Sequence, residues 1–126
     1  MQLPEKFIAR MERELGENEA NALCDALGKE PSTAIRLNPR KTTVPRWKAK
    51  RIEWSKDGYL LDERPSFTLD SDFHAGAYYV QEASSQFAGY ILSEVMGGEK
   101  QCRGMRVLDV CAAPGGKSTH YATLVG

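Results

Sequence analysis

Apolar positions recur at helical spacing in the N-terminal segment of the chain. One face of residues 4–15 carries four apolar side chains, those of Phe7, Ile8, Met11 and Leu15. This spacing predicts an amphipathic helix over residues 4–15 that ends at Gly16. A second helix is expected to begin at an Asn18 cap and to end at Gly28.

The following residues show strand and turn signals. A short strand is predicted over residues 34–38. Residues 52–54 and 59–61 are expected to pair as a hairpin, because Asp57 and Gly58 between them form a favourable turn sequence. Helices and strands together predict a small α+β module over residues 1–70.

A change of pattern near residue 70 predicts a domain transition, with a second domain beginning at residue 71. Apolar positions on one stripe predict a long helix over residues 79–96. Residues 106–110 are expected to form a buried central strand, because β-branched and aliphatic residues dominate them. A glycine turn and the start of another helix follow. The fold class predicted for the whole chain is therefore α/β.

The glycine turn is where ligand chemistry is expected. Residues 112–116 carry little side-chain bulk, and the free N–H groups of the following helix favour an anionic or dipolar ligand. A phosphate-binding P-loop fits Gly116, Lys117 and Ser118, but Cys111 occupies the position of its first glycine. A methyltransferase loop for S-adenosylmethionine fits this composition better.

Three segments resemble motifs of the Nol1/Nop2/Sun family of RNA cytosine-C5 methyltransferases. Residues 109–119 are similar to its cofactor motif, residues 32–39 to its Arg-x-Asn segment, and residues 74–86 to its Gly-x-x-Tyr-x-Gln-Glu-x-Ser-Ser element. The segments occur in the family's order, and among its subgroups the chain most resembles a bacterial ribosomal-RNA enzyme. The resemblance implies that residues 71–126 begin a Rossmann-like methyltransferase domain.

The resemblance also implies a cofactor and a reaction. S-adenosylmethionine would bind at Cys111, Ala112, Ala113, Pro114, Gly115, Gly116 and Lys117. In the family a cysteine thiolate attacks cytosine C6, which makes C5 nucleophilic toward the methyl group. That cysteine would lie beyond residue 126, so no catalytic residue is assigned here and the isolated chain is expected to be inactive. Cys111 is expected to line the pocket through its backbone.

Charge is balanced overall but uneven along the chain, with 17 basic and 17 acidic residues. Residues 34–52 contain no acid and seven bases. Such a stretch can neutralise phosphates, or it can be a solvated basic loop. With the resemblance, the segment is predicted to contact RNA, ribosomal RNA in particular, through Arg36, Asn38, Arg40 and Lys41. Arg36 and Asn38 are expected to share one face of the strand.

The remaining composition is that of an ordinary globular protein. The three cysteines match neither a zinc site nor a disulfide framework, and His74 and His120 lack partners at metal-ligand spacing. No metal is therefore expected. The sequence has neither a membrane-spanning run nor a secretory leader, which predicts a cytoplasmic protein. Two alternatives stay open, a standalone RNA-binding module without cofactor and a P-loop-like nucleotide binder.

Overall fold

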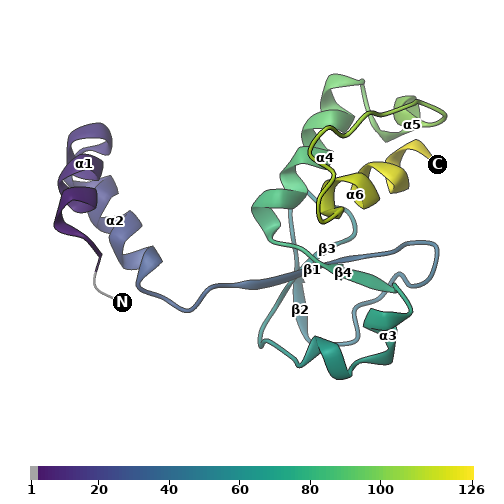
Figure 1. Cartoon of the computed structure of the whole chain (residues 1–126), viewed down its shortest axis with the longest axis horizontal. Coiled ribbons are helices and arrows are strands. Elements are labelled where there is room, and N and C mark those ends of the chain that lie inside the picture. Colours follow the sequence, from purple (N-terminus) through teal and green to yellow (C-terminus); the bar gives the residue numbers. More distant parts are fainter. Residues whose placement is uncertain (1–2) are drawn as a thin grey trace. The chain divides into compact units, whose positions relative to one another are not determined.

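A computed structural model describes residues 3–126 of the chain (Figure 1). Its contacts divide it into two units, the first ending at Pro31 and the second running from Ser32 to Gly126. None of the helices in the described part of the chain has the length and apolarity needed to cross a membrane.

The first unit is a pair of helices, α1 (Glu5–Leu15) and α2 (Glu17–Leu27), that pack against each other. Gly16 turns the chain between them with a φ of 83°, which favours glycine. Both predicted helices are confirmed. The Asn18 cap is wrong, because the turn at Gly16 lets α2 begin at Glu17 and places Asn18 inside its first turn.

The second unit is built on an antiparallel sheet of four strands in the order β2-β3-β1-β4. The strands are β1 (Thr33–Leu37), β2 (Ala49–Arg51), β3 (Gly58–Leu61) and β4 (Tyr78–Val80). β1 pairs on one side with β3 and on the other with β4. All five of its residues are buried, so it is the central strand of the unit.

The sheet is covered on both faces, which explains the burial of β1. Ile35 and Leu37 face a core of aromatic and aliphatic residues, with Phe67 and Tyr78 among them. This side also carries a 3₁₀ turn (Phe67–Leu69) and α3 (Ser71–His74). The opposite side carries α4 (Ala83–Val95), α5 (Glu99–Cys102) and α6 (Gly116–Val125), as Figure 1 shows.

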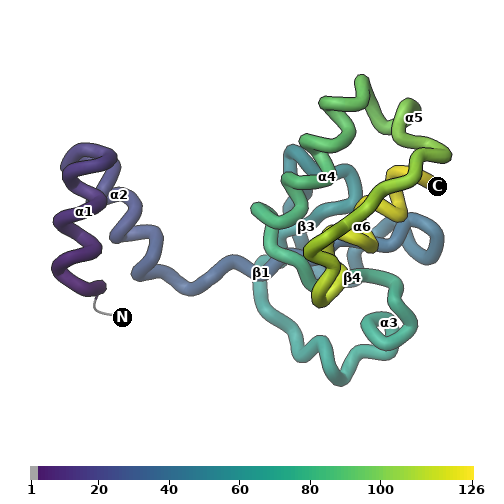
Figure 2. The backbone as a smooth tube through the Cα atoms, turned by 45° about the horizontal axis from the view of Figure 1, so that its top comes forward, coloured from purple at the N-terminus to yellow at the C-terminus, as the bar shows by residue number. Residues whose placement is uncertain are grey.

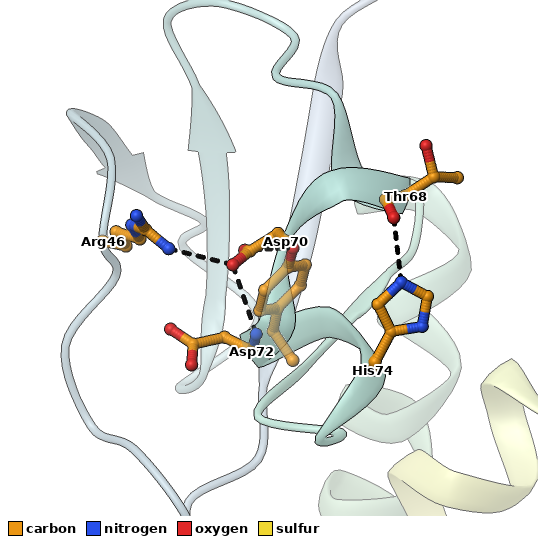
Figure 3. Close-up of polar contacts among 6 residues, drawn as sticks. Arg46, Thr68, Asp70, Asp72 and His74 are labelled. Carbon is orange, nitrogen blue, oxygen red and sulfur yellow. Dashed lines mark hydrogen bonds and ion pairs between the residues drawn. The ribbon is translucent and has the colours of Figure 1, made fainter.

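Asp70 organises the start of α3. Its carboxylate accepts hydrogen bonds from the Tyr78 hydroxyl at 2.7 Å, from Arg46 Nη1 at 2.9 Å and from the Asp72 backbone N–H at 3.2 Å. Figure 3 shows Arg46 and the Asp72 nitrogen converging on it, with His74 bonded separately to the Thr68 carbonyl. These donors, led by the Tyr78 hydroxyl, lower the pKa of Asp70.

The predicted strand over residues 34–38 is confirmed as β1, and residues 59–61 do belong to a hairpin, but the predicted first strand of that hairpin and its Asp57-Gly58 turn are wrong. Residues 52–54 form a turn, and the strand that pairs with β3 lies before them, at Ala49–Arg51. The Ile52 N–H donates to the Gly58 carbonyl at 2.9 Å and closes the loop. Ile52 is buried there, so its apolar character reflects packing at the end of the hairpin.

Two further expectations change near the middle of the chain. The helix predicted from residue 79 begins at Ala83, because Tyr78–Val80 pair with β1 as β4. The same pairing removes the expected structural division near residue 70, since β4 lies beyond it and completes the sheet of the residues before it.

The predicted buried strand over residues 106–110 does not form. Leu108 is 87% exposed and Val110 84% exposed. A central parallel strand needs hydrogen-bonding neighbours on both sides, and residues 3–126 place none beside this segment. The loop and the helix after it do form. The fold class, mixed α/β, is confirmed.

Candidate functional site

The glycine loop joins the extended segment to α6. Gly115 has a φ of 104° and caps the helix, which begins at Gly116. Figure 2 traces the connection from α5 back to the start of α6, which lies beside β4. A Cβ on Gly116 would lie 3.3 Å from Gln81 Nε2 and 3.4 Å from Tyr79 Cε1, so the loop backbone sits close against the end of β4.

Asp109 holds the two ends of this loop together. One carboxylate oxygen accepts from the Cys111 backbone N–H at 3.0 Å and the other from the Ser118 hydroxyl at 2.6 Å. These two hydrogen bonds lower the pKa of Asp109, and the bond from Ser118 has the larger effect. Asp109 therefore closes the loop, with the Ser118 hydroxyl as one of its two donors.

A cavity of about 330 Å³ lies between this loop and the start of α4. Six of the seven predicted cofactor residues border it, and Ala112 does not. The loop residues are Cys111, Ala113, Pro114, Gly115, Gly116 and Lys117. The opposite wall comes from the end of β4 and the first turns of α4, with Gln81, Glu82, Ser84 and Ser85 among its residues.

Two helices begin at this cavity. Glu82 precedes the first residue of α4 and Gly115 precedes that of α6, and both border the cavity. Neither helix has a side chain that caps its N–H groups. Unpaired N–H groups and two positive dipole ends suit a carboxylate or a phosphate. These N–H donors therefore suit the carboxylate at the amino-acid end of S-adenosylmethionine.

Of the four predicted RNA-binding residues, two are exposed, one is partly buried and one is buried. Arg36 is 3% exposed, and its guanidinium is bonded to protein groups. Asn38 is partly buried, donates to the Gly76 carbonyl at 3.1 Å and accepts from the Arg40 N–H at 3.2 Å. Arg36 thus lies under α6 rather than on an open strand face. Arg40 and Lys41 are exposed.

A second cavity, of about 300 Å³, lies beside the first. Three of the four predicted RNA-binding residues border it, namely Arg36, Asn38 and Arg40. Lys41 lies nearby and donates to the Ala75 carbonyl. Tyr79 borders both cavities.

The rest of the basic segment is partly neutralised. Arg46 pairs with Asp70 and Lys48 pairs with Asp62, each at 2.9 Å. The seven bases therefore do not form one continuous free patch. Among residues 3–126, no carboxylate forms an ion pair with Arg40 or Lys41.

Sequence reasoning assigned no site role to Tyr79, Gln81 or Thr119, although all three lie in segments that resemble family motifs. Tyr79 and Gln81 are two residues apart, so in a strand their side chains point to the same face. The sequence analysis predicted a helix over residues 79–96 and therefore did not use this strand signal. Thr119 lies one turn into α6, and apart from that resemblance nothing in the sequence around it indicates a role in the site. Its role depends on a contact with β1, 83 residues away.

None of the three cysteines is placed as a nucleophile. Cys102 is fully buried and donates to the Gly98 carbonyl, and Cys24 belongs to the separate helical unit. Cys111 is exposed on the loop, its N–H bound to Asp109. Within residues 3–126, His, Cys, Asp and Glu side chains form no group of three that would hold a metal ion.

Comparison with known protein families identifies the class of protein to which this domain belongs. A family model described as the N-terminal domain of 16S rRNA methyltransferase RsmF matches residues 3–83, more than half of the chain. The chain belongs to this family, which confirms the membership predicted from the three sequence motifs.

Curated relatives and solved structures agree. The chain is 30% identical to a probable ribosomal RNA small subunit methyltransferase B of Synechocystis sp. and 31% identical to ribosomal RNA small subunit methyltransferase F of Vibrio cholerae. Each match covers 98% of this chain and 28% of the relative, so the chain spans less than a third of their length. A crystal structure of a methyltransferase homologue from Pyrococcus horikoshii matches with a TM-score of 0.71 at 28% identity, over 97% of this chain and 45% of that one.

Proposed function

We propose that this chain is the N-terminal part of an S-adenosylmethionine-dependent enzyme that makes 5-methylcytosine in ribosomal RNA. The observation that carries the proposal is the first cavity, where the glycine loop and two uncapped helix starts meet around about 330 Å³. When bound there, S-adenosylmethionine would supply the methyl group. Family membership supports the substrate class, since the named relatives are ribosomal RNA methyltransferases.

The residues have separate parts in this proposal. The N–H groups at the starts of α4 and α6 would hold the anionic end of the methyl donor. Gly115 and Gly116 would let it approach the backbone, because they carry no Cβ. Cys111 would line the pocket through its backbone, and Asp109 would keep the loop closed.

RNA would be held beside this cavity. Arg40 and Lys41 are exposed cations available for phosphates, and Arg40 borders the second cavity. The target cytosine would leave its stack to reach the methyl donor. A cysteine thiolate outside residues 1–126 would attack C6, and the resulting nucleophilic C5 would take the methyl group before losing its proton. The isolated chain would then have no turnover.

The test is the effect of S-adenosylmethionine on thermal unfolding of this chain and of a longer form that continues to the length of the relatives. A ligand that binds the native state raises the unfolding midpoint. Hydrogen exchange at the Gly116 and Lys117 amides provides a local readout, since a ligand bound to these N–H groups would slow it. Stabilisation of the longer form together with slower exchange at these amides is the expected result.

Ser85→Phe, which fills the first cavity, should abolish both effects. Ser71→Phe, at an exposed serine of α3, should leave them in place. If S-adenosylmethionine affects neither form while RNA binds with salt-dependent affinity, the protein is an RNA-binding module and the glycine loop is a turn.

A further inference from the structure

Arg36 bonds to the start of α6 from the central strand of the sheet. Its Nε donates to Gln81 Oε1 at 2.9 Å, and its Nη2 donates to Thr119 Oγ1 at 2.7 Å and to the Gly116 carbonyl at 3.3 Å. The bonds to Gly116 and Thr119 span 80 and 83 residues of sequence. One side chain thus ties β1, the residue after β4 and the first turn of α6 together.

This position of a cation is not explained by ion pairing. Among residues 3–126, no carboxylate forms an ion pair with Arg36, and its acceptors are neutral. Burial lowers the pKa of Arg36 to about 10, partly offset by the charge of Asp57. The side chain is therefore still charged at neutral pH, beside the positive dipole end of α6. Such a placement needs another reason.

The bonds of Arg36 fix the peptide planes of the glycine loop. Arg36 holds the Gly116 carbonyl directly, and it holds the Thr119 hydroxyl, which in turn donates to the Gly115 carbonyl at 2.9 Å. In a trans peptide the N–H lies opposite the C=O. Holding these two carbonyls therefore sets the direction of the N–H groups of Gly116 and Lys117, and both residues border the first cavity.

The bonded groups also lie between the two cavities. Arg36 and Thr119 border the second cavity, whereas Gln81 and Gly116 border the first. We propose that Arg36 is a positioning residue that orients the amide groups of the glycine loop for the methyl donor. This inference deepens the proposed function and rests on it for the identity of the ligand. It removes Arg36 from the residues expected to contact RNA phosphates.

The test can be made without S-adenosylmethionine. Backbone order parameters of Gly115, Gly116 and Lys117 would be measured by NMR in this chain, where rigid backbone gives about 0.85 and flexible backbone less than about 0.6. Arg36→Lys keeps the charge but not the forked donor geometry, so these values should fall into the flexible range. Thr119→Val, which removes the hydroxyl, should have the same effect, whereas Thr119→Ser should keep the wild-type values.

Arg40→Lys is the matched control, since Arg40 borders the second cavity but makes no bond to the loop. Unchanged loop order in both Arg36→Lys and Thr119→Val would overturn the proposal. A uniform loss of order that includes β1 and β3 would also overturn it, because Arg36 would then support the whole fold.

A second readout separates this inference from the proposed function. In the longer form, Arg36→Lys should weaken S-adenosylmethionine binding about tenfold and leave the KM for RNA unchanged, whereas Arg40→Lys should leave donor binding unchanged. Donor affinity unchanged by Arg36→Lys would overturn the positioning role. If the longer form binds no donor at all, the proposed function fails, and the order parameters still decide whether Arg36 holds the loop.

Discussion

The imidazole ring of His120 packs directly against the backbone of Gly89, where α6 crosses α4. A Cβ at position 89 would lie 2.6 Å from both ring nitrogens, closer than real atoms approach. His120 is 8% exposed, and its Nδ1 has no hydrogen-bond partner in the described part of the chain. The glycine therefore sets how closely the two helices that begin at the first cavity can pack.

Gly89→Ala should lower the free energy of unfolding by about 1–3 kcal/mol, because the added methyl group forces the helices apart. Chemical denaturation followed by circular dichroism would measure the change. The same substitution in a His120→Ala background should cost much less, since the ring is absent. An equal loss in both backgrounds would show that the ring is not the obstacle.

Acid should destabilise the protein through His120. Burial, with a smaller contribution from the charge of Arg36, lowers the pKa of His120 to about 4. Below the ordinary value near 6.5 the unfolded state binds a proton that the folded state excludes. Stability is therefore full above pH 6.5 and should fall by up to about 3 kcal/mol as the pH drops to about 4.

Denaturant titrations at several pH values between 7.5 and 4.5 would show this slope. His120→Gln should flatten it, whatever its effect on stability at neutral pH, whereas His74→Gln should leave it in place. The aspartates whose pKa is lowered, Asp70 and Asp109, add acid sensitivity only at lower pH. A slope that persists in His120→Gln would assign the effect to other groups.

Tyr78→Phe should destabilise the sheet unit by about 1–3 kcal/mol, because the hydroxyl donates to the buried Asp70 carboxylate at 2.7 Å. Thermal and chemical unfolding would measure the loss. Tyr59→Phe, on β3 of the same sheet, is the control, since the Tyr59 hydroxyl makes no hydrogen bond within residues 3–126. Equal effects of both substitutions would argue against a special contribution from the Asp70 bond.

RNA affinity should depend on Arg40 and Lys41. Replacing either by alanine should weaken binding of a labelled single-stranded RNA and reduce the slope of log K against log salt by about 1. Fluorescence anisotropy at several salt concentrations would give both quantities. Lys6→Ala removes the same charge from an exposed position in α1 and should change neither quantity. Equal losses for all three variants would indicate a nonspecific charge effect.

Local patterns in the sequence predicted much of this structure. The helices α1 and α2, the strand β1 and the loop that caps α6 follow from apolar spacing and from glycine positions, which act over a few residues. The loop residues Cys111 to Lys117 could be proposed as ligand-binding because removal of side-chain bulk before a helix is visible in the sequence. Six of these residues do border one cavity.

Only the tertiary structure decided which residues meet across long distances. It paired Tyr78–Val80 with β1, where helical spacing had predicted the start of a helix, because a free edge of β1 offered backbone hydrogen bonds. It left Val107, Leu108 and Val110 exposed, because an apolar segment cannot form a strand without a partner strand. It also buried Arg36 beneath α6, since the acceptors that make this burial possible lie 45 to 83 residues away and no local pattern reveals them.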